Sequence, residues 1–227
     1  IMRPVAGVAD GSRSGIAEPM KGRFVTFEGV EGSGKSTQVR MLAEHFQRKG
    51  MSVLVVREPG GTALGEAIRQ LLLDPAGKMV PEAELLLFLA ARAQNTAEVI
   101  QPALQMGRLV VCDRYTDSTI AYQGYGRGLD LPTVRAMNAF ATGGLEPDLT
   151  VLLDLPVETG LVRQSERDRM GAESLEFHRR VREGYLAEAA AQPRRFRVLQ
   201  AERPASEIHE AVVREVGRIL SEEEGEG

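Results

Sequence analysis

A glycine-rich loop followed by a lysine and a serine is the strongest chemical signal in this sequence. Residues 29–36 read GVEGSGKS, which fits the pattern G-x-x-x-x-G-K-[ST] between a predicted strand and a predicted helix. The glycines allow backbone N–H groups to converge at a helix N-terminus, where they bind anionic oxygens. Lys35 would bring a positive charge to the β and γ phosphates, and the Ser36 hydroxyl can be a Mg²⁺ ligand. We therefore predict a nucleoside triphosphate site, with a glycine-rich turn and an exposed lysine as the alternative. The predicted triphosphate-binding residues are Gly29, Val30, Glu31, Gly32, Ser33, Gly34, Lys35, Ser36 and Thr37.

Arginines that follow other predicted strands indicate a second phosphate site. Arg57 and Glu58 come after the second strand, and Asp113 and Arg114 come after the third. Ligands bind at the carboxyl ends of the strands in an open α/β sheet, so these side chains should face the same crevice as the loop. An arginine there can hold a phosphate through paired hydrogen bonds. For Arg114, a structural ion pair with Asp113 or another acid is the alternative.

Phe88 and Arg92 lie four residues apart on a predicted helix and therefore share a face. An aromatic ring for stacking and a guanidinium beside it could hold a planar base. Taken alone, such a pair would more often be a core phenylalanine with a solvated arginine.

A basic segment follows the fourth predicted strand. Arg163 and Arg167 share a helix face, and Arg169 stands close to Gly171. We expect a short lid over about residues 163–173 that closes over a transferring phosphoryl group and neutralises its charge. An ordinary solvated basic face is equally compatible with the spacing.

The kinds of residue that are missing also limit the chemistry. His45, His178 and His209 lie on predicted helices away from every strand end, so we expect all three at the surface, and no His/Cys cluster has metal-ligand spacing. A kinase that acts on a hydroxyl usually needs a carboxylate to accept the proton. A phosphate acceptor has its second pKa near ~6 and is already ionised at neutral pH. Several arginines without an obvious base therefore favour transfer to a phosphate.

The elements that must position these residues alternate strand and helix along the chain. Short apolar runs predict buried strands, and longer runs of 3.6-residue period predict helices. We therefore expect an α/β fold, the three-layer P-loop NTPase type, with a five-stranded parallel sheet and helices on both faces. Strands are predicted at 23–27, 52–56, 109–112, 149–154 and 196–199, and helices at 36–49, 64–73, 81–105, 132–140, 156–167, 173–190 and 204–220.

Composition excludes several classes of protein. The 227 residues carry 28 Lys+Arg and 32 Asp+Glu, a net charge of −4, which argues against a nonspecific nucleic-acid binder. The longest apolar run, residues 85–91, is too short to span a membrane, and the single cysteine, Cys112, cannot form an intrachain disulfide. We expect a cytoplasmic protein with a flexible N-terminal extension at 1–22, one domain at 23–220 and an acidic tail at 221–227.

Five motifs occur together in this sequence: FEGVEGSGKST (27–37), REPGGT (57–62), FLAARAQ (88–94), DRYTDSTIAYQGYGRG (113–128) and PDLTVLLDL (147–155). Together they resemble the bacterial thymidylate kinase family. The resemblance runs from about residue 23 to residue 220, and its most diagnostic stretch is 113–128, since other nucleoside monophosphate kinases share the phosphate loop but not AYQG after Asp-Arg-Tyr. The resemblance implies ATP-dependent phosphorylation of dTMP to dTDP with Mg²⁺ in a cytoplasmic homodimer.

The resemblance also implies roles for single residues. Phe88 would stack on thymine, Arg92 would bind its exocyclic oxygen, and Tyr122 would exclude a ribose 2′-hydroxyl. Thr119 and Gln123 would complete the base contacts. The phosphate of dTMP would be held by Arg69 and Arg114, with Arg57 nearby. Glu31 and Glu58 would act near the sugar 3′-hydroxyl and the Mg²⁺-bound water, with Asp113 behind them. Asp113 would support the metal, directly or through water, beside Ser36. The implied catalytic set is Lys35, Glu31, Arg114, Arg163, Arg167 and Arg169.

One position departs from part of the family. Some members carry a catalytic arginine in the phosphate loop where this chain has Gly32, so the cation for the transition state would have to come from Arg163, Arg167 or Arg169. Two other functions stay open: a P-loop kinase for another nucleoside monophosphate, and an NTP-dependent switch or ATPase.

Overall fold

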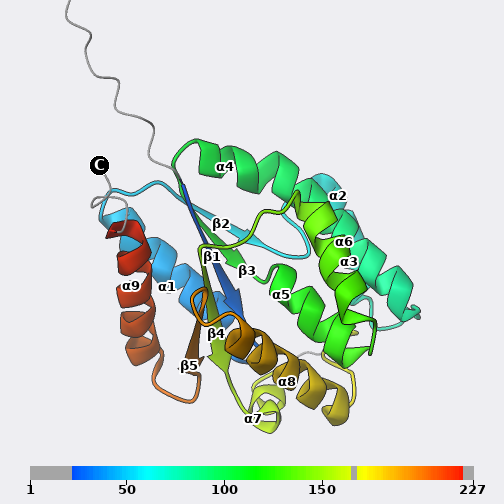
Figure 1. Ribbon diagram of the computed structural model, residues 1–227. Coiled ribbons are helices and arrows are strands. Elements are labelled where there is room, and N and C mark those ends of the chain that lie inside the picture. The colour runs from blue at the N-terminus through cyan, green and yellow to red at the C-terminus, as the bar shows by residue number, and fades with distance from the viewer. Residues whose placement is uncertain (1–21, 165–167, 222–227) are drawn as a thin grey trace, which may run out of the picture.

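Five parallel strands form the central sheet in a computed structural model, which describes residues 22–164 and 168–221. The strand order is β2-β3-β1-β4-β5, with every neighbouring pair parallel (Figure 1). The predicted five-stranded parallel sheet is therefore confirmed. The strands are β1 (Arg23–Glu28), β2 (Val53–Arg57), β3 (Leu109–Asp113), β4 (Leu149–Asp154) and β5 (Phe196–Gln200).

Helices cover both faces of this sheet, as the sequence predicts. One face packs against α1 (Lys35–Arg48) and α9 (Ala205–Ser221), which lie side by side in Figure 1. The other face is covered by α4 (Gln101–Gln105) and α8 (Leu175–Ala191). Alternate residues of β1 serve the two cores: Val25 packs on the α1 side, and Phe24 packs on the opposite side. This two-sided burial explains why the strands are apolar almost without interruption.

The predicted helix at 81–105 is interrupted by a wider turn. It consists of α3 (Pro81–Asn95), a π-helical segment η1 (Thr96–Ile100) and α4. Pro102 has no N–H to donate, and its ring crowds the carbonyl four residues before it, which disfavours a regular α-helix at this point. The N–H of Gln101 accordingly donates to the carbonyl of Thr96, five residues back.

A helical segment that the sequence analysis did not predict follows β3. It comprises α5 (Thr116–Thr119) and a second π-helical segment, η2 (Ile120–Gly126). Its serine, threonines and glycines are poor helix formers, so the segment gave no local helix signal. Packing supplies the stability instead, because Ala121 and Tyr122 are buried against α8.

The boundaries of two other helices also differ from the prediction. The helix expected at 156–167 is shorter in the structure, where α7 spans Val157–Val162. Residues 165–167 of the expected range lie outside the described residues. The helix expected from 173 begins at Leu175, because the Ser174 hydroxyl accepts a hydrogen bond from the N–H of Phe177 and caps it. The remaining helices are α2 (Ala63–Leu73) and α6 (Leu131–Thr142).

The N-terminal extension and the acidic tail expected from the sequence lie almost entirely outside the described residues. Within the described ranges, no helix is long and apolar enough to cross a membrane.

Candidate functional site

A cavity of about 300 Å³ lies where the carboxyl ends of β1, β2 and β3 meet. Its walls combine the glycine-rich loop, the β2–α2 connection, α2, α3, and the segment that runs from β3 into η2. Most of the residues singled out from the sequence line it: Glu31, Gly32, Lys35, Ser36, Arg57, Glu58, Arg69, Phe88, Arg92, Asp113, Arg114, Thr119, Tyr122 and Gln123. Segments more than 90 residues apart along the chain therefore form a single site.

The loop before α1 has the backbone that phosphate binding requires. Gly29, Gly32 and Gly34 all have positive φ, and Gly34 is the N-cap of α1. The ammonium of Lys35 donates to the carbonyls of Gly29 at 3.0 Å and Val30 at 2.9 Å. Burial and the nearby Arg114 charge lower the pKa of Lys35 to about 8, against the opposing effect of nearby carboxylates. The lysine therefore stays mainly protonated at neutral pH and ready to exchange these carbonyls for phosphate oxygens.

Gly32 touches α7 backbone to backbone. A Cβ built on Gly32 would lie 2.2 Å from the carbonyl oxygen of Gly160, and one on Gly160 would lie 2.3 Å from the carbonyl oxygen of Glu31. Any side chain at position 32 would have to displace α7. An arginine there is thus incompatible with this arrangement of loop and helix.

Arg114 has an unusual backbone and several hydrogen bonds. Its φ is +71°, and its guanidinium donates to the Gly29 carbonyl, to the Tyr185 and Ser118 hydroxyls, and to Glu31 Oε1 at 3.0 Å. The ion pair weighed in the sequence analysis thus exists, but with Glu31 rather than Asp113. Because this pair lies in the cavity wall, it orients Arg114 within the site.

Glu31 connects the loop to two further side chains. Its Oε1 accepts hydrogen bonds from the Tyr122 hydroxyl at 2.6 Å and from Arg114. Burial acts to raise the pKa of Glu31, but the Arg114 charge and the proximity of His178 outweigh it and hold the pKa well below its ordinary range. Glu31 is therefore a carboxylate at neutral pH.

His178 is buried, so the expectation that it lies at the surface is wrong. It is 1% exposed, and its Nδ1 lies 3.4 Å from Glu31 Oε2. The packing of α8 against η2 turns this residue toward the loop. A signal was present in the sequence, since His178 precedes the buried Val181 and Tyr185 by three and seven residues and thus shares their helix face.

Arg92 is a buried residue rather than the solvated arginine considered as an alternative. It is 2% exposed, and it donates to Glu58 Oε2 at 2.7 Å, to the Thr119 hydroxyl, to Asn138 Oδ1 and to the Tyr115 carbonyl. These contacts use four of its five N–H groups. Asn138, which the sequence analysis missed, lies on α6, and only the tertiary packing brings it to this guanidinium.

Phe88 and Gln123 flank Arg92 in the cavity wall. Phe88 is half-buried and packs on the α2 side chains Ile68 and Leu72. The Gln123 amide donates to the fully buried Glu84 at 2.8 Å. The ring, the guanidinium and the amide therefore lie around one space.

The three arginines that the sequence analysis assigns to a lid differ in their surroundings. Arg163 is exposed at the end of α7 and lies 3.4 Å from the carbonyl oxygen of Gly32. Arg169 is 9% exposed and donates to Glu84 and to the Leu72 carbonyl, and it does not line the cavity. Arg167 lies outside the described residues. Of the two described arginines, only Arg163 is next to the loop.

The remaining polar residues occupy the cavity rim. Arg69 donates to the Pro59 carbonyl at 2.8 Å, and the exposed Arg57 pairs with Glu66 at 3.2 Å. On the opposite side, the Ser36 hydroxyl donates to Asp113 Oδ2 at 2.7 Å. Among the described residues, no group of three or more His, Cys, Asp or Glu side chains could hold a metal ion by itself.

Comparison with known proteins identifies the family. The family model described as thymidylate kinase matches residues 27–212. Curated relatives named thymidylate kinase include one from Desulfovibrio desulfuricans, 54% identical over 82% of this chain and 90% of that protein, and one from Carboxydothermus hydrogenoformans, 55% identical over 83% of this chain and 94% of that protein. The crystal structure of thymidylate kinase from Ehrlichia chaffeensis has a TM-score of 0.72 and 35% identity, covering 86% of this chain and 98% of that one. The chain belongs to the thymidylate kinase family.

Proposed function

We propose that this chain transfers the γ-phosphoryl group of ATP to dTMP, forming dTDP and ADP. The observation that carries the proposal is that Phe88 and Arg92 line the same cavity as the phosphate loop. An oxygen of the dTMP phosphate attacks the γ-phosphorus, and the bond from that phosphorus to the β–γ bridging oxygen breaks. The acceptor phosphate is already ionised, so the site needs no general base.

Lys35 and the loop N–H groups would hold the triphosphate at the N-terminus of α1. Ser36 and Asp113 are the residues that would hold Mg²⁺, since their oxygens lie 2.7 Å apart at the cavity wall. A small oxygen set fits this ion, which takes most of its ligands from water and phosphates. When bound, it would neutralise charge on the β and γ phosphates. Thr37 and the loop residues Gly29, Val30, Gly32, Ser33 and Gly34 would complete the ATP site.

The acceptor would occupy the other half of the cavity. Its phosphate would lie between Arg114 and Arg69, with Arg57 at the rim. Its base would stack on Phe88, with Arg92, Thr119 and Gln123 around its polar edge. Tyr122, whose hydroxyl donates to Glu31 Oε1 at 2.6 Å, would lie under the sugar. Glu58, which also lines the cavity, pairs with Arg92 at 2.7 Å and neutralises its charge.

The proximity of Arg163 to the loop supports it as the lid residue that neutralises the transferring group. Arg169 would instead anchor the lid, through its ion pair with Glu84 at 2.6 Å. The clash that a Cβ on Gly32 would make with Gly160 supports a cation supplied from outside the loop. We assign residues 23–220 to this kinase domain, with the lid at about 163–173.

A homodimer is the proposed assembly, in a cytoplasmic location. Large apolar side chains are exposed on helices that neighbour one another in Figure 1: Leu64 and Leu71 on α2, Leu86 on α3, and Phe140, 91% exposed, on α6. Such exposure is typical of a protein interface. The buried thiol of Cys112 is compatible with a reducing compartment. Light scattering of wild type and Phe140→Ser would test the assembly.

A coupled assay of ADP production tests the activity. The protein is supplied with ATP, Mg²⁺ and, one at a time, dTMP, dUMP, CMP or AMP. We expect turnover with dTMP and much slower turnover with CMP and AMP. Equal rates with dTMP and CMP would indicate a general nucleotide kinase, and ADP formation without any acceptor would indicate an ATPase.

A further inference from the structure

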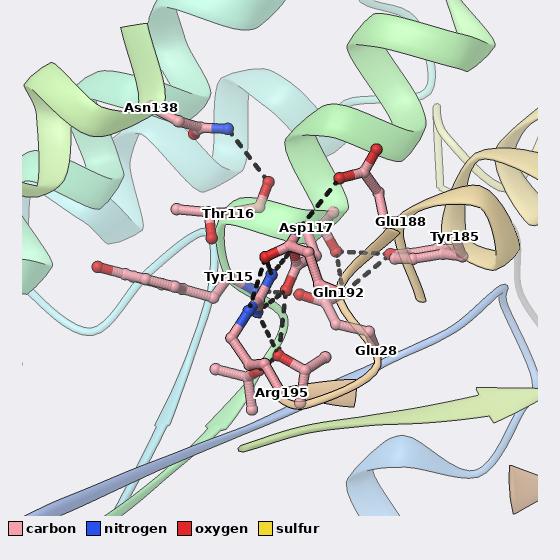
Figure 2. Close-up of polar contacts among 12 residues, drawn as sticks. Glu28, Tyr115, Thr116, Asp117, Asn138, Tyr185, Glu188, Gln192 and Arg195 are labelled. Carbon is pink, nitrogen blue, oxygen red and sulfur yellow. Dashed lines mark hydrogen bonds and ion pairs between the residues drawn. The ribbon is translucent and has the colours of Figure 1, made fainter. Parts of the chain in front are cut away.

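A buried carboxyl group, Glu28, lies behind Arg114 and has no part in the site described above. It is the last residue of β1 and is fully buried. Its Oε1 accepts a hydrogen bond from the N–H of Tyr115 at 2.7 Å. Its Oε2 lies 2.6 Å from the Ser118 hydroxyl and 2.9 Å from the Tyr185 hydroxyl, and Figure 2 shows Glu28 and Tyr185 facing each other.

Glu28 Oε2 and the hydroxyl oxygens of Ser118 and Tyr185 form a closed triangle that requires three protons. The Ser118 and Tyr185 hydroxyls are 2.8 Å apart, so every side of the triangle has the length of a hydrogen bond. Each side needs one proton, and the two hydroxyls bring one each. With an ionised carboxyl, one side would join two oxygens with no proton between them. A proton on Glu28 Oε2 completes the ring.

Among the charges near Glu28, that of Asp117 favours the neutral carboxyl and that of Arg114 opposes it. Asp117 on α5 is a buried carboxylate near it, and Arg195 neutralises Asp117 rather than Glu28, through contacts of 2.7 and 2.9 Å that Figure 2 shows. Arg114, at the end of β3, reaches the two hydroxyls and not the carboxyl. The Lys35 ammonium donates to loop carbonyls and Ser33.

The titration of Glu28 agrees with this geometry. Burial and the charge of Asp117 raise the pKa of Glu28 to about 7, even though Arg114 and the hydrogen bonds from Ser118 and Tyr115 act to lower it. A carboxyl whose pKa is raised holds its proton below that value and releases it above. Glu28 therefore changes charge near neutral pH.

We propose that the protonated, neutral form of Glu28 is a positioning residue for Arg114. The inference rests on the proposed function, in which Arg114 binds the phosphate of dTMP. Nη1 of Arg114 donates to the Ser118 hydroxyl at 3.2 Å and to the Tyr185 hydroxyl at 3.0 Å. The proton ring fixes both hydroxyls so that their lone pairs face the guanidinium. Ionisation of Glu28 breaks the ring and puts a negative charge behind Arg114, which competes with the phosphate for that arginine.

Glu28→Gln is the variant that tests the positioning role, because its amide resembles the protonated carboxyl and cannot ionise. The KM for dTMP is measured for wild type and variant between about pH 6 and about pH 8.5. Lys35 and the dTMP phosphate titrate in both proteins, so the ratio of the two KM values isolates Glu28. We expect the ratio of wild-type KM to variant KM to rise at least about threefold across this range, with a midpoint near pH 7. A ratio that does not vary with pH would overturn the proposal.

An infrared measurement tests the proton without relying on activity or on the variant. The difference spectrum of ligand-free wild type between about pH 6 and about pH 8.5 should contain the carbonyl band of a buried protonated carboxylic acid at the lower pH. The band should be missing from Glu28→Gln and present in the control Glu44→Gln, which changes a carboxylate on α1 whose side chain is 46% exposed. Absence of the band from wild type would overturn the proposal. A band in a protein that does not phosphorylate dTMP would refute the proposed function instead.

Discussion

Replacing Glu84 by glutamine should destabilise the protein, because this buried carboxylate is the counter-charge of two arginines. Glu84 lies on α3 and accepts hydrogen bonds from Gln123, Arg127 and Arg169. Arg127 also pairs with Glu173 at 2.6 Å. Among the described residues, Arg169 pairs with no carboxylate other than Glu84. The isosteric substitution therefore removes the charge and leaves Arg169 buried without a partner of opposite sign.

The size of the effect follows from the burial of this cluster. Removing one partner of a buried ion pair costs about 3–5 kcal/mol. The lower end, about 3 kcal/mol, applies here, because Arg127 keeps Glu173 and because the side chains of Arg127 and Arg169 are 16% and 9% exposed. In a domain of this size, 1 kcal/mol shifts Tm by roughly 2–4 °C, so Tm should fall by roughly 6–12 °C.

The matched control is Glu158→Gln, which removes an ion pair of similar length from the surface. The Glu158–Arg179 distance is 2.6 Å, but the two side chains are 54% and 52% exposed. Exposed pairs contribute little, so Tm should hardly change. Calorimetry of wild type and both variants at neutral pH makes the comparison. Equal losses of Tm in the two variants would refute the reasoning.

The pH dependence of the same Tm difference gives a second check. Burial acts to raise the pKa of Glu84, but hydrogen bonds from Arg127, Gln123 and Arg169 outweigh it and hold the pKa below its ordinary value. A carboxyl with a lowered pKa stabilises the fold above its unfolded-state pKa of about 4.3, and this stabilisation is lost as the pH falls through the folded-state value. The Tm difference between wild type and Glu84→Gln should be largest at neutral pH and shrink below about pH 4.

Two further substitutions test contacts of the phosphate loop. Gly32→Ala would place a Cβ 2.2 Å from the Gly160 carbonyl oxygen, whereas Gly50→Ala, also at positive φ, meets nothing within 4 Å. Calorimetry should therefore show a larger Tm loss for Gly32→Ala, and its kcat should fall at least about tenfold, roughly 1.4 kcal/mol. His178→Phe keeps the buried volume without a donor toward Glu31, whereas His178→Asn keeps a donor near Nδ1. The KM for dTMP should rise about tenfold in the phenylalanine variant and less in the asparagine variant; the reverse order would show that packing is what His178 supplies.

Motif spacing predicted the parts of the site that lie on contiguous segments. The loop from Gly29 to Thr37 could be recognised because its glycines, Lys35 and Ser36 act through their own local backbone. Residues at strand ends, such as Arg57 and Arg114, could also be assigned to the site, since parallel strands bring their carboxyl ends to one edge. Both inferences need only the order of elements along the chain.

Residues that act through distant partners were not predictable in the same way. His178 reaches Glu31 across 147 residues of sequence, and Asn138 reaches Arg92 across 46. The α5–η2 segment forms because α8 covers it, against its own weak helix propensity. The spacing of Arg169 relative to the other arginines predicted a place in a basic lid. In the structure Arg169 instead donates to the buried Glu84 and does not line the cavity.

The sequence by itself determined the fold class, the phosphate loop and the family of this protein, because strand burial, helix period and motif spacing are local properties of the chain. Only the tertiary structure decided which charges are paired, which histidine is buried and where Glu28 sits relative to Arg114. The physical reason is that burial, pKa and hydrogen bonding depend on neighbours that packing supplies, and the triangle of Glu28, Ser118 and Tyr185 joins β1, α5 and α8.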